Sequence, residues 1–77
     1  MSILSVTKSA NAVNVWFDNT KMHIYLEDGR ELAVPIDWFS SLRDAKPSQR
    51  NNWRFIGDGE GIHWNDLDED ILVEGLL

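Results

Sequence analysis

The residue with the clearest chemical potential is His63, because an imidazole titrates near neutral pH and can act as a general base. It lies between Ile62 and Trp64, and the nearest carboxylates upstream of it are those of Asp58 and Glu60. A general base needs a nucleophile or a second acid beside it, and carboxylates in a glycine-rich turn are normally solvated. We therefore expect a structural histidine whose ring bonds a backbone carbonyl or an acidic side chain. A small enzyme that uses His63 is an alternative.

Three alternating carboxylates, on Asp66, Asp68 and Asp70, resemble the start of a calcium-binding loop. Such a loop needs a glycine at its sixth position and a bidentate glutamate at its twelfth. Those positions are Ile71 and Leu77 here, so we expect no metal site and no cofactor. The carboxylates are expected to cap a helix or to meet basic groups instead.

The spaced glycines Gly57, Gly59 and Gly61 could suggest a phosphate-binding loop. Such a loop is normally followed by a helix and often carries a lysine. Asp58 and Glu60 occupy this one and would repel phosphate, so we predict a tight turn.

Acidic residues are concentrated at one end of a chain with a formal net charge of −6. Residues 58–77 hold seven of the thirteen Asp and Glu residues and none of the Lys and Arg residues. This distribution disfavours direct binding to nucleic acid, which depends on Lys and Arg, and permits a basic protein partner. A solvated surface that keeps the protein soluble is the simpler explanation. The partner-binding residues predicted from this segment are Asp66, Asp68, Glu69 and Asp70.

Four cationic residues recur at spacings of three, four and four, which resembles a helical stripe interrupted by Pro47: Arg43, Lys46, Arg50 and Arg54. A stripe of this kind can contact the acidic segment of the same chain, or that of a second copy in a homodimer. A nucleic-acid patch is weak beside the negative net charge.

Two aromatic residues, Trp16 and Tyr25, fall on the polar sides of their predicted strands. An exposed pair would suit a protein interface, where aromatic residues dominate the binding energy. The alternative is that another element covers this side of the sheet. The remaining tryptophans, Trp38, Trp53 and Trp64, are expected in the core.

Apolar and polar residues alternate over residues 13–17, 22–27 and 31–36, which predicts a three-stranded antiparallel meander. Asp28 and Gly29 form a strong hairpin signal. Residues 3–8 are a further candidate strand. The inward-facing side chains expected on the first strand of the meander are Val13, Val15 and Phe17.

The segment after the meander has apolar residues at helical spacing. Asp37 is placed to cap a helix, and Pro47 both ends it and suits the first turn of a second short helix over residues 47–52. The apolar face of the first helix would comprise Trp38, Phe39, Leu42 and Ala45.

The rest of the chain predicts a short hairpin, with residues 53–56 paired to 62–64, and a closing helix over 71–77. The expected fold is a single α+β domain over residues 1–77, with a small antiparallel sheet (a three-stranded meander plus a short hairpin) packed with one or two short helices. The sequence has no Cys, no signal-peptide pattern and no apolar run long enough for a membrane span, so we expect a cytoplasmic protein.

Several of these motifs together resemble a family of small bacterial proteins, the domain of unknown function 2442. The resemblance runs from about Val13 to Leu77. Its motifs are the Asp28-Gly29-Arg30 hairpin, Trp38-Phe39, Gln49-Arg50, Trp53, the three spaced glycines, Gly61-Ile62-His63-Trp64 and Leu67-Asp68-Glu69-Asp70-Ile71.

Two positions depart from the family pattern. Many relatives have Pro at Asn65 and Ser at Leu72, which leaves Asp70 as the expected cap of the last helix.

The resemblance implies a compact α+β fold and little chemistry. Relatives are sometimes joined to helix-turn-helix domains, and many are encoded beside small proteins suspected of being toxins. We therefore expect a non-enzymatic interaction module, an antitoxin-like partner of a small basic protein. The alternative is an acidic inhibitor that mimics nucleic acid and occupies a partner's nucleic-acid site.

Overall fold

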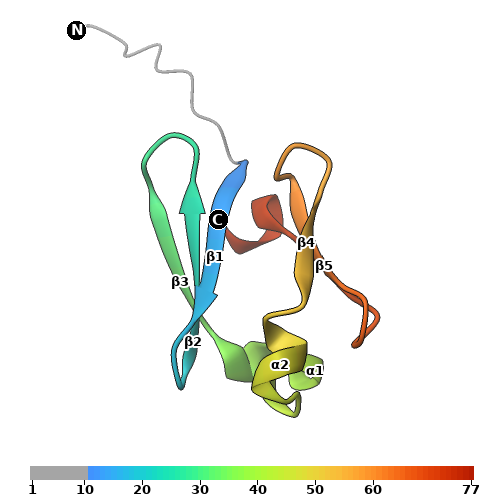
Figure 1. Ribbon diagram of the computed structural model, residues 1–77. Coiled ribbons are helices and arrows are strands. Elements are labelled where there is room, and N and C mark those ends of the chain that lie inside the picture. Colours follow the sequence, from blue (N-terminus) through green and yellow to red (C-terminus); the bar gives the residue numbers. More distant parts are fainter. Residues whose placement is uncertain (1–10) are drawn as a thin grey trace, which may run out of the picture.

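The computed structural model describes residues 11–77, which form two three-stranded antiparallel sheets with orders β1-β2-β3 and β4-β5-β6 (Figure 1). The candidate strand over residues 3–8 lies outside the described residues. No helix within residues 11–77 is long and apolar enough to cross a membrane. The elements are β1 (Ala12–Phe17), β2 (Lys21–Leu26), β3 (Glu31–Pro35), η1 (Ile36–Trp38), α1 (Ser40–Arg43), α2 (Pro47–Arg50), β4 (Trp53–Ile56), β5 (Gly61–Trp64), β6 (Glu69–Leu72) and η2 (Val73–Leu76).

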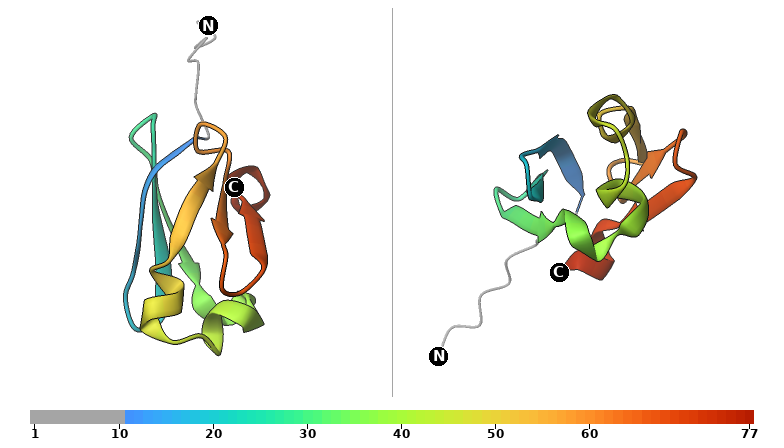
Figure 2. Two further views of the ribbon diagram at one scale, coloured as in Figure 1. Left: turned by 45° about the vertical axis from the view of Figure 1, so that its right-hand side comes forward. Right: turned by 90° about the horizontal axis from the view of Figure 1, so that it is seen from below.

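The two sheets stand opposite each other, and the short helices α1 and α2 close one end of the space between them (Figures 1 and 2). Both sheets contribute to one hydrophobic core, which also includes Leu42 of α1 and Val73 of η2. The largest fully buried side chain is that of Trp64 in the central strand β5. The small α+β fold expected from the sequence is therefore confirmed.

The first meander forms as the alternation of residues predicts, with one change at its start. Met22, Ile24 and Leu26 of β2 are all buried. A bulge in β1 between Ala12 and Asn14 shifts the register, so Ala12 is buried and Val13 is 55% exposed. The prediction that Val13 points inward is wrong for this reason.

The predicted hairpin of β4 and β5 is extended by a third strand, β6, which comes from the acidic segment. Asp70 lies in this strand, so it does not cap the last helix as expected. That helix is a 3-10 turn, η2, which begins after Leu72. Ile71 is buried and its neighbours in β6 are not, which is the alternation of a strand.

The predicted helix after the meander is broken into η1 and α1. Phe39 between them has extended backbone angles, and the N-cap position of α1 has no side-chain hydrogen bond, so Asp37 is not a cap. Phe39 packs on the core. Because of the break, Trp38 does not share a helical face with Leu42. Its side chain is 68% exposed, so the expected core position is wrong.

The second short helix, α2, begins at Pro47 as predicted. Lys46 before it is extended, and its N–H donates to the side-chain oxygen of Gln49 at 2.9 Å. Trp53 directly after the helix is half-buried against the core.

The glycine-spaced segment is a turn, as predicted, and it joins the two sheets. Gly57 and Gly59 have positive φ angles, which favour glycine. The N–H of Ala12 in β1 donates to the carbonyl of Gly59 at 2.7 Å, and this bond connects the two sheets. The N–H of Val73 donates to the carbonyl of Glu60 at 3.0 Å.

Candidate functional site

The outward side of the first sheet carries a set of side chains that no described element covers. Trp16 is 40% exposed there, although it is a large aromatic residue. Cross-strand pairing places Trp16 opposite His23, and His23 opposite Ala33. We call this surface the β1–β3 outer face, and by register it comprises Asn14, Trp16, His23, Tyr25, Glu31 and Ala33.

The centre of this face is a stacked pair of rings. The ring centroids of Trp16 and His23 lie 3.9 Å apart, and the ring planes are within 6° of parallel. His23 Nε2 bonds the Oδ2 atom of Asp18 at 2.6 Å. The imidazole therefore stacks on the indole with its face and bonds the Asp18 carboxylate with its edge. These two contacts of His23 fix the orientation of the indole.

Asp18 is itself fixed by the turn between β1 and β2. Its Oδ1 atom accepts hydrogen bonds from the backbone N–H groups of Thr20, at 2.8 Å, and Lys21, at 2.7 Å. The hydrogen bond from His23, followed by those from Thr20 and Lys21, lowers the pKa of Asp18 well below its usual value of 3.8. A carboxylate held this way stays charged in all but strongly acidic solution.

Trp16 and Tyr25 share the outer face but are not directly opposite each other. Tyr25 pairs with Asn14, so it lies diagonally from Trp16, and its side chain is half-buried. The neighbour that supports the indole is His23. The alternation along residues 22–27 puts His23 on the polar side of its strand, but it does not indicate what the ring contacts.

The sequence contained a signal for that contact. A two-residue turn at Asn19 and Thr20 pairs Asp18 with Lys21, and counting back along both strands brings Trp16 opposite His23. The N–H of Asp18 does donate to the carbonyl of Lys21, at 3.0 Å.

His63 lies on the outward side of the second sheet, in the central strand β5. In the sheet it pairs with Asp70 of β6 on one side and with Arg54 of β4 on the other. The Nδ1 atom of His63 also bonds the carboxylate of Asp70. The expected hydrogen bond to an acidic residue is therefore present. Among residues 11–77, the His63 ring has no further side-chain hydrogen bond, to a hydroxyl or to a second acid.

The other predicted acidic contacts are spread over different sides of the β5–β6 hairpin. Asp66 accepts from the side-chain amide of Asn52 at 3.0 Å, and half-buried Glu69 accepts from the hydroxyl of Ser41 at the same distance. Asp68 is exposed in the turn with a φ of 48°. Glu69 and Asp70 are neighbours in a strand and point to opposite faces. The carboxylates do not form one continuous track.

The four predicted basic residues do not form a stripe either. Arg50 donates to the backbone carbonyls of Leu42, at 2.7 Å, and Arg43, at 2.8 Å, so it satisfies the end of α1. Arg43 pairs with its neighbour Asp44, which lowers the pKa of that carboxyl group and raises the pKa of the guanidinium. The two that remain exposed, without an ion pair within residues 11–77, are Lys46 and Arg54.

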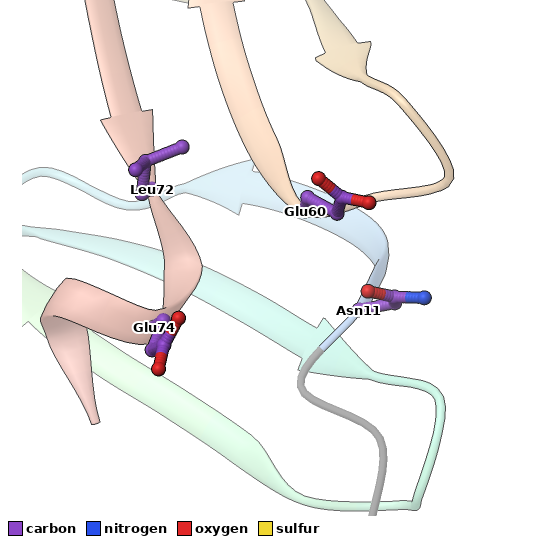
Figure 3. Close-up of a pocket in the computed structure, with 4 residues that line it drawn as sticks. All are labelled: Asn11, Glu60, Leu72 and Glu74. Atoms are coloured by element: carbon purple, nitrogen blue, oxygen red, sulfur yellow. The ribbon is translucent and has the colours of Figure 1, made fainter.

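A shallow hollow of about 180 Å³ lies between the start of β1, the β4–β5 turn and the end of the chain (Figure 3). It is lined by Asn11, Glu60, Leu72 and Glu74. None of its lining residues within 11–77 is a histidine or carries a hydroxyl, and no group of three metal-ligating side chains occurs in that part of the chain. The hollow therefore offers two carboxylates, the Asn11 amide and a leucine side chain.

Fold and surface together define a small α+β protein of two facing meanders, with an aromatic outer face on one of them. The chain belongs to the family described as "Protein of unknown function (DUF2442)", whose model matches residues 12–77. It is also similar to a crystal structure, at 2.75 Å resolution, of a protein of unknown function from Rhodospirillum rubrum ATCC 11170. The two chains are 29% identical, with a TM-score of 0.75, over 86% of this chain and 82% of the other. No curated protein matches the sequence.

Proposed function

We propose that this protein is a non-enzymatic interaction module that binds a small basic protein, in the manner of an antitoxin. The observation that carries the proposal is the exposed Trp16 indole, fixed on His23 in the β1–β3 outer face. A tryptophan that is already ordered loses little conformational entropy when a partner covers it. Such residues are typical binding hot spots.

The charge of the chain supports a basic partner. A formal net charge of −6 on 77 residues accelerates association with a cationic protein and disfavours association with nucleic acid. Asp68 and Asp70, which are exposed on the β5–β6 hairpin, are a second candidate contact surface.

The partner can be tested directly. Any small basic protein encoded beside this gene is co-expressed with it, and binding of any that co-purifies is measured by calorimetry. We expect a saturable complex that Trp16→Ala weakens about thirtyfold or more, because truncation of a hot-spot residue costs about 2 kcal/mol or more. The matched control is Trp38→Ala, since Trp38 is exposed on a different element.

The electrostatic part has its own test. The double variant Asp68→Lys, Asp70→Lys is compared over a salt series with Asp37→Lys, Asp58→Lys, which changes the net charge equally at other exposed positions. A larger loss in the first variant places the partner on the hairpin, and equal losses show that only net charge matters. Displacement of this protein from its partner by DNA or RNA would favour the nucleic-acid-mimicking alternative instead.

A further inference from the structure

We propose that the open face of the Trp16 indole receives an arginine guanidinium from the basic partner. This inference rests on the proposed function, because it names the chemical group through which that partner is recognised. It starts from the position of the ring at the end of a stack.

The stack leaves one face of the indole open. β1 is an edge strand in the order β1-β2-β3, and His23, which covers the first face of the ring, belongs to β2. The second face therefore points away from β2, and no other strand of this sheet lies on that side within residues 11–77. The exposed fraction of 40% for Trp16 agrees with this geometry.

The support beneath the indole is rigid. His23 is bonded to Asp18, and Asp18 accepts two backbone hydrogen bonds from its own turn. The turn fixes Asp18, Asp18 fixes His23, and His23 supports the indole of Trp16. The indole is therefore presented in one orientation. A flat, pre-oriented aromatic face binds a flat cation without paying to order itself.

The chemistry of the site selects a guanidinium. An indole has the strongest cation-attracting face among the aromatic side chains. A guanidinium is planar and weakly hydrated, so it stacks on an aromatic face better than an ammonium does. By register, Lys21 and Glu31 lie on this side of the sheet, and the Asp18 carboxylate bonds His23 from the adjoining turn. The formal net charge of the chain is −6, which favours a cationic ligand.

The experiment uses peptides of known chemistry with the full-length chain. Hexa-arginine, hexa-lysine and hexa-citrulline are titrated into the protein, and the indole N–H signals of its tryptophans are followed by NMR. We expect hexa-arginine to bind about two- to five-fold more tightly than hexa-lysine and to shift the Trp16 signal, because a guanidinium stacks on the indole better than an ammonium does. Hexa-citrulline, which has the same shape without the charge, should not bind.

Variants of the protein test whether Trp16 is the source of the preference for arginine. Trp16→Leu should abolish the preference for arginine over lysine, and Trp16→Phe should retain part of it. Trp38→Leu should leave it intact. His23→Ala should reduce it while leaving the protein folded, because the indole loses its support.

Several results would overturn the inference: no binding of hexa-arginine, an equal affinity for hexa-lysine, or a preference that survives in Trp16→Leu. The proposed function fails separately, through the absence of any complex with a basic partner in co-purification. A partner that binds through other residues would leave the proposed function standing and remove the arginine site.

Discussion

The backbone N–H of Ala12 donates to the carbonyl of Gly59 at 2.7 Å, and this bond ties the first strand of one sheet to the turn of the other. A β-carbon added at Gly59 would lie 2.2 Å from the carbonyl oxygen of Ala12. The contact between the two meanders therefore requires glycine at this position, for reasons of space as well as of backbone angle.

Gly59→Ala should lower the free energy of unfolding by about 2–4 kcal/mol, because it combines a positive φ with a backbone collision. Gly29→Ala is the matched control, since Gly29 also has a positive φ, of 93°, but open space around it. The control should cost about 1 kcal/mol. Urea unfolding followed by tryptophan fluorescence measures both, and equal losses would contradict the close approach of the two sheets.

Trp64→Phe should cost about 2–4 kcal/mol of stability. Trp64 is fully buried, and its Nε1–H donates to the backbone carbonyl of Arg50 at 2.8 Å. The smaller ring leaves a cavity and an unpaired carbonyl. Trp38→Phe, at an exposed position, should change stability by less than about 0.5 kcal/mol. A large effect at Trp38 would mean that this side chain is covered in solution.

Arg50→Lys should destabilise the protein by about 1–2 kcal/mol, although the charge is retained. The guanidinium bonds two carbonyl groups at the end of α1 through two different nitrogen atoms, which an ammonium cannot match in the same geometry. Arg54→Lys, on an exposed strand position, is the control and should be nearly neutral. Thermal unfolding of the two variants compares them, and similar melting temperatures would argue against the capping role.

Asp18→Asn should change the dependence of stability on pH. The folded-state pKa of Asp18 lies below its usual value of 3.8, so the charged carboxylate stabilises the folded state above that value. This contribution is lost as the pH falls through the folded-state pKa. The stability difference between wild type and Asp18→Asn should therefore shrink from about pH 5 to about pH 2.

Asp58→Asn provides the comparison for that experiment, since it removes the same charge from an exposed turn. Chemical unfolding of all three proteins across this range gives the result. A difference between wild type and Asp18→Asn that is constant with pH would show that Asp18 is not held by His23 and its turn.

The first meander was predictable because more buried and more exposed positions alternate along β2 and β3. β6 was not, because both of its first two residues are acidic and Leu72, which points outward, is apolar. Glu69 occupies a half-buried position, where the hydroxyl of Ser41 donates to it at 3.0 Å. A contact between residues so distant in the sequence has no local signal.

Trp38 illustrates a similar limit in the helical region. Its spacing from Phe39 and Leu42 fits one face of a helix, but that argument requires an unbroken helix. The extended backbone of Phe39 breaks the phase, so Leu42 is buried while Trp38 is exposed. The local sequence does not reveal such a break, because it depends on how Phe39 reaches the core.

The candidate site was predictable in part. Trp16 was expected on the outer side of its strand, and it lies there. Its support from His23 depends on the register of the β1–β2 hairpin, and its rigidity depends on the hydrogen bonds that Asp18 makes within the turn. Residue types alone do not carry that information.

The order of the strands has a kinetic consequence. Within residues 11–77, every strand pairs only with the strand next to it along the chain, so each meander closes through short loops. Chains dominated by such local pairings fold faster than chains of similar size with distant pairings. The bond between Ala12 and Gly59 spans a long stretch of sequence and should form after the folding barrier. Gly59→Ala should therefore accelerate unfolding while leaving the refolding rate nearly unchanged.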